Sequence, residues 1–137
     1  MKKATIILVI LFSALTTHVD AQNLTKEQCL KYISDMSNEL VQHNTSEACP
    51  LENFRLEYET LKWEKHCDSS SEHQTLTLSG LYIDQDGTGD WICIKNSKGE
   101  VFKRCDKTAP GQKDRLEKLL KALQYLSKFT TKDPFAN

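Results

Sequence analysis

The pattern of hydrophobic and polar positions after residue 24 predicts an amphipathic helix of about four turns. Thr25 and Gln28 form a capping-box pattern at its expected start. One apolar stripe follows at spacings of four, three and four, formed by Cys29, Ile33, Met36 and Leu40. We expect this stripe to face the core.

The segment 51–67 is open to two interpretations. Apolar residues alternate with polar ones over 54–58 and again, in the opposite phase, at Leu61 and Trp63, which a bulge near Thr60 would explain. Helical spacing fits several of the same apolar residues, and the intervening Glu and Lys residues favour helices. We favour a strand, because aromatic and β-branched residues are enriched and a polar turn at 68–72 follows.

Three later segments are also predicted to be strands. Residues 75–83 alternate, and Gly80 marks an expected bulge. Residues 91–94 are continuously apolar, which is typical of a strand buried on both faces. A turn at 96–99 leads into a strand at 101–105 and so predicts a hairpin.

The register of this hairpin matters for its two cysteines. With the turn centred between Ser97 and Lys98, Cys93 faces Phe102 and Cys105 faces Asp90. We therefore expect no direct disulfide between the two cysteines.

A wide apolar stripe after Pro110-Gly111 predicts a closing helix, formed by Leu116, Leu119, Leu120, Leu123, Leu126 and Phe129. Its natural partner is the apolar face of the sheet. The predicted fold class is thus α+β: an N-terminal helix, a three- or four-stranded antiparallel sheet, and a C-terminal amphipathic helix packed on the sheet. The tail from about residue 130 is expected to fray.

The first 21 residues predict a signal peptide. Lys2 and Lys3 precede an apolar run at 6–15, which is shorter than the ~20 residues that span a bilayer. Val19 and Ala21 are small residues at the positions that a signal peptidase reads, so cleavage after Ala21 is expected. Residues 22–137 should then form a single domain with no stable membrane anchor, secreted or periplasmic.

Charge argues against some classes of partner. The chain has a formal net charge of −1, with acidic and basic residues mixed along it. Such a balance attracts neither nucleic acid nor an anionic membrane, so we expect neither partner.

Export places the cysteines where disulfides form and persist. We expect one or two bridges among Cys29, Cys49, Cys67, Cys93 and Cys105. Because the number is odd, at least one sulfur is unbridged or paired between chains. We favour Cys29 with Cys49, and a second bridge among the other three; five buried thiols are the alternative.

The loop 84–90 is a candidate calcium site. Asp84, Asp86 and Asp90 stand around glycines, and carboxylates arranged in this way can converge on a hard cation. Counted from Asp84, however, the twelfth residue is Lys95, where an EF-hand requires a glutamate. A hairpin turn rich in Asp and Gly is the alternative. Calcium is the cofactor that this loop would bind.

Two other groups of residues are candidates for a site. His66, Cys67 and His73 are a candidate zinc or catalytic group, but His66 and Cys67 point to opposite faces if they lie on a strand. Aromatic residues could line a ligand pocket between sheet and helices, although such residues are more often core: Tyr58, Trp63, Tyr82 and Trp91.

The two end helices carry a resemblance. Residues 114–126 resemble the closing helix of small exported Bacteroidota proteins of unassigned function, and 24–33 are similar to their opening helix. The resemblance implies a periplasmic or secreted location and no particular activity.

These observations predict an exported, non-enzymatic domain that binds a partner protein or a small apolar ligand. The alternative is a small envelope enzyme or a calcium-binding module that uses the 84–90 loop.

Overall fold

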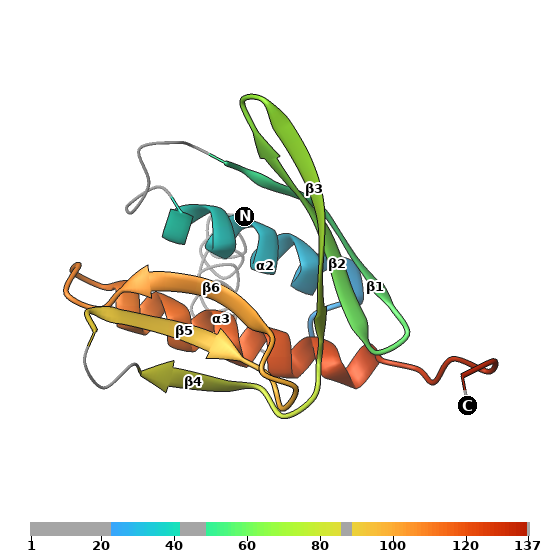
Figure 1. Ribbon diagram of the computed structural model, residues 1–137. Coiled ribbons are helices and arrows are strands. Elements are labelled where there is room, and N and C mark those ends of the chain that lie inside the picture. The colour runs from blue at the N-terminus through green and yellow to red at the C-terminus, as the bar shows by residue number, and fades with distance from the viewer. Residues whose placement is uncertain (1–22, 42–48, 86–88, 137) are drawn as a thin grey trace, which may run out of the picture.

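The computed structural model describes residues 23–41, 49–85 and 89–136. These residues form two α-helices, one short 3-10 helix and six strands (Figure 1). The predicted signal peptide lies outside the described residues, so its cleavage stays a prediction. In the part of the chain that the structure describes, no helix is long and apolar enough to cross a membrane.

Helix α2 (Lys26–Val41) confirms the predicted first helix. The capping box forms as expected: the Thr25 N–H donates to Gln28 Oε1 at 2.9 Å, and the Gln28 N–H donates to Thr25 Oγ1 at 3.2 Å. Residues of the predicted stripe that are at most 1% exposed are Cys29, Ile33 and Leu40.

The segment 51–67 is extended, as favoured, but it forms two strands, β1 (Leu51–Glu57) and β2 (Thr60–Cys67). Tyr58 and Glu59 close a tight hairpin between them. The change of phase is therefore a chain reversal, and the predicted bulge near Thr60 is wrong. A bulge lies instead between Glu52 and Arg55, where Asn53 has a φ of 56°.

Two strands, β3 (Ser70–Thr77) and β4 (Tyr82–Gln85), replace the single strand predicted for 75–83. They belong to different sheets. Gly80 lies between them with a φ of 60°, and a Cβ at this position would lie 2.7 Å from Ser97 Cβ. The glycine marks the crossing from one sheet to the other, not a bulge.

Strands β5 (Trp91–Lys95) and β6 (Val101–Asp106) form the predicted hairpin in a different register. Cys93 pairs with Arg104, not Phe102, and Cys105 pairs with Ile92, not Asp90. The turn spans residues 96–100, and a bulge at Lys103, whose φ is 51°, shifts the register further.

Burial of β5 follows the prediction with one exception. Ile92, Cys93 and Ile94 are at most 6% exposed, but Trp91 is 42% exposed. Trp91 begins the strand next to Asp90, so the apolar run in the sequence extends one residue beyond the buried part.

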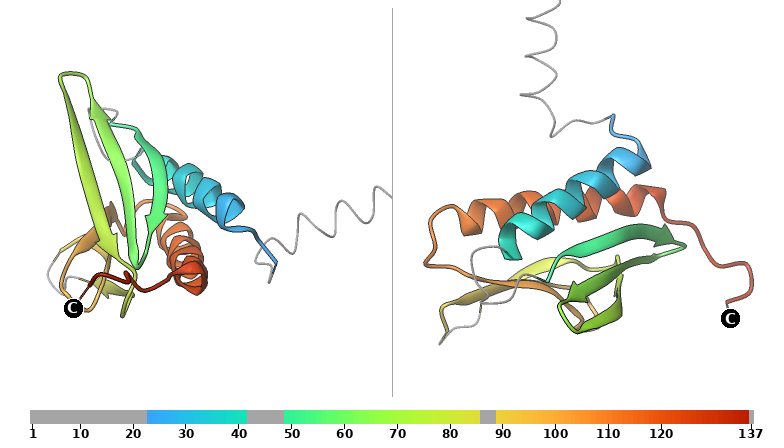
Figure 2. Two further views of the ribbon diagram at one scale, coloured as in Figure 1. Left: turned by 90° about the vertical axis from the view of Figure 1, so that its right-hand side faces the viewer. Right: turned by 90° about the horizontal axis from the view of Figure 1, so that it is seen from above.

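Helix α3 (Gln112–Leu126) confirms the closing helix and continues into η1 (Ser127–Phe129). It runs antiparallel to α2: the Tyr125 hydroxyl donates to the Leu24 carbonyl at 3.2 Å, near one end, and Arg115 lies 4.0 Å from Glu39 near the other. The two helices lie side by side as one layer (Figure 2). The α3 leucines that face the core are Leu116, Leu119, Leu123 and Leu126.

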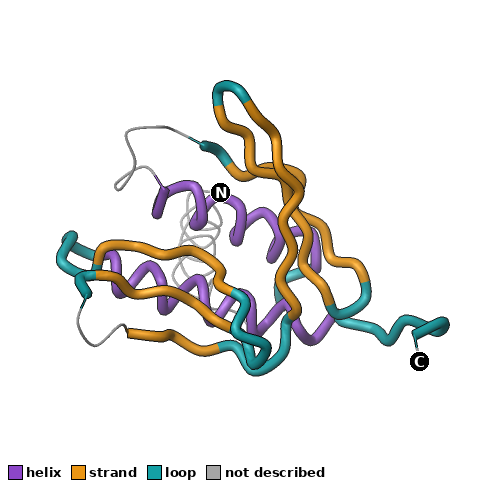
Figure 3. Tube along the Cα trace, in the orientation of Figure 1, coloured by secondary structure: helices purple, strands orange, loops and turns teal. Residues whose placement is uncertain are grey.

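The second layer consists of two antiparallel sheets, with strand orders β1-β2-β3 and β4-β5-β6. The predicted α+β class is confirmed, although the strands divide between two sheets and do not form one. Phe102 meets Trp63 edge to face, with 5.0 Å between ring centroids, and so joins the sheets inside one core. The β2–β3 hairpin extends beyond the helices (Figure 3).

Asn96 makes a second, polar connection between the sheets. Its Nδ2 donates to the Thr77 carbonyl at 3.0 Å and to Glu100 Oε1 at 2.6 Å. Its Oδ1 accepts the backbone N–H groups of Lys98 and Glu100. Because each side-chain atom is hydrogen-bonded, Asn96 can be 1% exposed at little cost.

The described tail follows η1. The Thr131 N–H donates to the Tyr58 carbonyl at 3.4 Å, which places the start of the tail beside the β1–β2 turn. Whether the tail frays stays a prediction.

Candidate functional site

One face of the β4–β5–β6 sheet packs on the helices, and the opposite face carries cross-strand rows of aromatic and charged residues. In Figure 1 the helices lie behind this sheet. We call the face that they leave uncovered the outer face. Strand alternation and register assign it Tyr82, Lys95 and Val101 in one row, Asp84, Cys93 and Arg104 in the next, and Trp91 and Asp106 in the last.

Large apolar side chains are exposed to solvent on this face. Tyr82 is 46% exposed, Val101 45% and Trp91 42%. Arg104 is exposed as well. Exposed aromatic residues grouped with an arginine are characteristic of surfaces that bind other proteins.

An ion pair crosses the centre of the outer face. Lys95 Nζ lies 2.6 Å from Asp84 Oδ2. The hydrogen bond to Asp84, together with its charge, raises the pKa of Lys95 above the usual lysine value. This carboxylate is already neutralised by a neighbour on the adjacent strand.

The predicted calcium site stays a prediction. Asp86 lies outside the described residues, Asp84 is paired with Lys95, and the Asp90 carbonyl accepts the Lys107 N–H at 2.7 Å. Within the described ranges, no three His, Cys, Asp or Glu side chains form a ready-made metal site.

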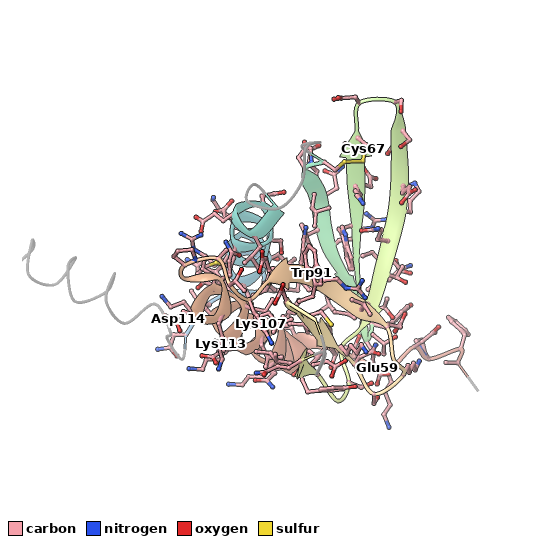
Figure 4. All side chains as sticks on the ribbon, turned by 60° about the vertical axis from the view of Figure 1, so that its left-hand side comes forward. Glu59, Cys67, Trp91, Lys107, Lys113 and Asp114 are labelled. Carbon is pink, nitrogen blue, oxygen red and sulfur yellow. A yellow bond between two sulfur atoms is a disulfide. The ribbon has the colours of Figure 1, made fainter. Side chains whose placement is uncertain are left out.

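The disulfide joins Cys49 to Cys67, so the favoured Cys29–Cys49 pairing is wrong, as is a bridge from Cys67 to Cys93 or Cys105. Cys49 lies two residues before the start of β1 and Cys67 ends β2, and antiparallel pairing brings their Cα atoms to 4.5 Å. Cys29 instead faces α3, where its thiol donates to the Ala122 carbonyl at 3.3 Å. Figure 4 shows Cys67 at the opposite end of the sheet from Glu59.

The other three cysteines are buried thiols. Burial raises the pKa of Cys29 to about 11 and has the same main effect on Cys105. Both thiols are therefore protonated at neutral pH, whereas a nucleophilic or metal-binding cysteine must lose its proton. As expected, Cys93 and Cys105 do not form a bridge, although the register behind that expectation differs.

The four aromatic residues that could line a pocket differ in exposure and fall into two groups. Trp63 is 4% exposed, stacks on Phe54 and belongs to the core. Tyr58, Tyr82 and Trp91 are at least 40% exposed. A cavity of about 370 Å³ does lie beside Tyr58, but it is lined largely by charged residues, among them Glu57, Glu59, Lys62, Lys132 and Asp133.

Two histidines and two glutamates gather on the β1–β2–β3 sheet. Glu52 pairs with Glu64 and Glu64 with His73 across the three strands, and His66 follows Glu64 on the same face. We call this group the histidine–glutamate cluster. His66 Nε2 lies 3.3 Å from Glu64 Oε2 and 3.7 Å from Glu52 Oε2, and His73 Nδ1 lies 3.8 Å from Glu64 Oε1.

The histidine–glutamate cluster differs from the candidate group of His66, Cys67 and His73 that the sequence suggests. Cys67 is removed, because it is in a disulfide and strand alternation turns it to the other face. Glu52 and Glu64 lie beside the histidines, and these two glutamates were not identified from the sequence. The spacing of Glu64 and His66 by two residues was the available signal, since a strand places such residues on one face.

A hydrogen bond from Asn53 favours the ionised form of the Glu64 side chain. Asn53 Nδ2 donates to Glu64 Oε2 at 2.7 Å. This bond, followed by the hydrogen bond to His66 and the charges of both histidines, lowers the pKa of Glu64 below the usual range of a glutamate. The carboxylate is ionised at neutral pH.

Comparison of the chain with protein-family models, with curated proteins and with solved structures gives no match. The resemblance of the end helices to exported Bacteroidota proteins stays a prediction.

Proposed function

We propose that this chain is an exported, non-enzymatic binding domain, and that a partner protein docks on the outer face of the β4–β5–β6 sheet. The observation that carries the proposal is the exposure of Tyr82 and Trp91 on one face together with Arg104. Tryptophan, tyrosine and arginine are the residue types that most often dominate the binding energy of protein interfaces.

The form of the surface favours a protein over a small apolar ligand. Small ligands are generally held in concave, mostly apolar pockets. The outer face is one side of a three-stranded sheet, and an ion pair between Asp84 and Lys95 crosses it. Apolar residues around a paired charge suit a broad interface whose polar groups are matched by the partner.

Export is part of the proposal. The signal-peptide pattern of residues 1–21 supports it, and the Cys49–Cys67 disulfide is consistent with an oxidising compartment. The protonated thiols of Cys29 and Cys105 support a role in packing and not in covalent chemistry.

The test begins with photo-crosslinking in the cells from which the chain comes. Val101→p-benzoylphenylalanine places the probe on the outer face, and Phe135→p-benzoylphenylalanine places it in the tail, where Phe135 is 89% exposed. We expect a single protein to be captured from position 101 and not from position 135. The captured protein is then purified and its affinity for the chain is measured by calorimetry.

Substitutions on the face decide the result. Trp91→Ala and Tyr82→Ala should each weaken binding roughly 30-fold or more, which corresponds to about 2 kcal/mol. Phe135→Ala is the matched control and should change the affinity less than about twofold. Unchanged affinity in both face variants, or capture of a second copy of this chain alone, would overturn the proposal.

A further inference from the structure

The cavity of about 370 Å³ beside Tyr58 lies between the β1–β2 turn and the tail that follows η1. The turn and the strand ends next to it form one wall, and Lys132, Asp133 and Ala136 of the tail line the other. The Thr131 N–H donates to the Tyr58 carbonyl at 3.4 Å, so the two walls are in contact beside the cavity. The cavity adjoins a different sheet from the proposed docking face, so its role is independent of that face.

Tyr58 has an unfavourable backbone conformation at the edge of this cavity. It lies in the tight turn between β1 and β2, and its φ is 55°. A glycine adopts this left-handed conformation without steric cost, whereas a bulky residue is strained there. The tyrosine is 40% exposed, so neither the turn nor burial in the core accounts for a ring at this position. Backbone strain of this kind is concentrated at functional sites, and Tyr58 lines the cavity.

The charged residues of the cavity are only partly paired with one another. Lys62 Nζ lies 2.8 Å from Glu57 Oε2, and the hydrogen bond and charge of Lys62 lower the pKa of Glu57 below its usual range. This pair is neutral as a unit. In the part of the chain that the structure describes, the side chains of Glu59, Asp133 and Lys132 form no ion pair. The cavity therefore presents two carboxylates and one ammonium group that a ligand of opposite charges would match.

Each wall contributes one of these carboxylates from a defined position. The Glu59 carbonyl accepts the Leu78 N–H at 2.9 Å, which fixes the backbone of Glu59 beside the end of β3 (Figure 4). In the tail, Asp133 Oδ1 accepts the Phe135 N–H at 2.8 Å, and its second oxygen makes no hydrogen bond to the described residues. Oxygen atoms on both sides of the cavity are therefore available as acceptors.

We propose that this cavity binds a cationic amino acid such as L-arginine. Glu59 and Asp133 accept hydrogen bonds from its two cationic groups, and the Lys132 ammonium donates to its carboxylate. A guanidinium over the face of the Tyr58 ring gains a further electrostatic attraction. The ligand then offers two positive groups and one negative group to a cavity whose unpaired residues carry two negative charges and one positive charge.

The size and lining of the cavity favour such a ligand over an apolar one. Its volume is at the lower end of the range of about 300–1,000 Å³ that small-molecule sites occupy. Most such sites are lined by apolar side chains, whereas charged groups dominate here. Because the ligand would contact both walls, we also expect it to slow hydrogen exchange at the Thr131 amide.

The test is an NMR titration of the ¹⁵N-labelled protein, expressed from its full-length coding sequence, with L-arginine at constant ionic strength. We expect saturable shifts at the amides of Tyr58, Glu59 and Asp133 with a dissociation constant below about 1 mM. Agmatine lacks the carboxylate of arginine, and L-citrulline lacks the charge of its side chain. Each analogue should bind about fivefold more weakly or worse, because each loses one charged contact.

Glu59→Gln and Tyr58→Gly test the two walls' contributions separately from folding. Each should weaken arginine binding about fivefold, and Tyr58→Gly should leave the melting temperature unchanged or higher, because glycine relieves the strained turn. Glu72→Gln is the matched control: it removes an exposed carboxylate from β3 of the same sheet, away from the cavity, and should keep the affinity within about twofold.

The proposal is supported only if arginine binds more tightly than both analogues and both cavity variants weaken it. No saturable shift below about 10 mM arginine would overturn it. Equal affinity for arginine and citrulline, equal affinity for arginine and agmatine, or equal weakening by Glu59→Gln and Glu72→Gln would overturn it as well.

Discussion

The two sheets of this protein achieve order by different means. In the β4–β5–β6 sheet, the central strand buries three consecutive residues, Ile92 to Ile94. In the β1–β2–β3 sheet, the first four residues of β3 are all exposed, and only Leu76 in that strand is fully buried. The outer half of the first sheet therefore has little core of its own. It is joined by the Cys49–Cys67 disulfide and by polar contacts between strands, from His66 to Glu52 and from His73 to Glu64.

The two sheets therefore present different kinds of exposed surface. The second sheet buries apolar residues along its central strand, while its outer face carries exposed Tyr82 and Trp91. A covalent link holds the first sheet where it extends beyond the helices, and this allows a polar surface with paired charges there.

The largest expected effect tests whether the sheets share one core. Phe102→Ala removes a ring that is 1% exposed and that meets Trp63 of the other sheet edge to face. We expect the free energy of unfolding to fall by about 3–5 kcal/mol. Urea denaturation measures the change, and hydrogen exchange should show both sheets losing protection together. Val101→Ala, in the same strand but 45% exposed, is the control and should stay within about 0.5 kcal/mol. A loss confined to one sheet would show that the sheets are independent.

The next effect should distinguish the sheets. Replacing Cys49 and Cys67 together by serine opens a link of sequence separation 18 and should lower the free energy of unfolding by about 3 kcal/mol. Native-state hydrogen exchange should speed up first in β1 and β2, for example at the His66 amide, and least at Ile94 in the buried strand. If the amides of Ile94 and His66 lose protection equally, the disulfide does not act mainly on the β1–β2–β3 sheet.

The smallest effect concerns a lysine between the sheets. Lys103 is partly buried at the β6 bulge; burial lowers its pKa to about 8, and the charge of Lys65 on β2 contributes. In the unfolded chain a lysine has a pKa of about 10.4, so between about pH 8 and 10.4 the unfolded state binds more protons at this lysine than the folded state does. The contribution of Lys103 to the free energy of unfolding therefore becomes more favourable as pH rises through this range. Below pH 8 the charged lysine destabilises the fold.

Lys103→Met should therefore raise the free energy of unfolding at pH 7 by about 1–2 kcal/mol, after allowance for partial solvent screening. The advantage over the wild type should shrink between about pH 8 and pH 10. Urea denaturation of both proteins across this pH range gives the difference between their free energies of unfolding. The buried thiols titrate in both proteins, so their contribution cancels in this difference. A variant less stable than the wild type at pH 7 would contradict the assigned cost of burial.

Much of the fold was predictable from local pattern. The capping box of Thr25 and Gln28 and the leucine stripe of α3 predict the two helices, because both signals act within a few residues. The hairpin of β5 and β6 was predictable for the same reason. The division into two sheets was not: the alternation of 75–83 changes phase at Gly80, a bulge explains that change equally well, and only the tertiary structure, with Gly80 close to Ser97, shows that the chain changes sheets there.

The candidate sites were predictable only in part. The exposed aromatic residues of the outer face were identified by type, but alternation in a single strand could not show which of Trp63 and Trp91 lies in the core. A shift of one residue in register turns a side chain to the other face of a sheet, so errors such as the missed bulge at Lys103 change which groups meet. Glu52 and His66 are far enough apart along the chain that only the β1–β2 pairing brings them together.

Local sequence pattern is sufficient to predict the α+β composition, the positions of both helices and the segments able to form strands, because helix caps and apolar periodicity are properties of neighbouring residues. The tertiary structure decided which cysteines form the disulfide, which aromatic side chains are exposed, and which glutamates lie beside His66. These outcomes depend on register and on the packing of distant segments. The bulges at Asn53 and Lys103 leave no distinct local pattern, and the pattern at Gly80 does not distinguish a bulge from a crossing between sheets.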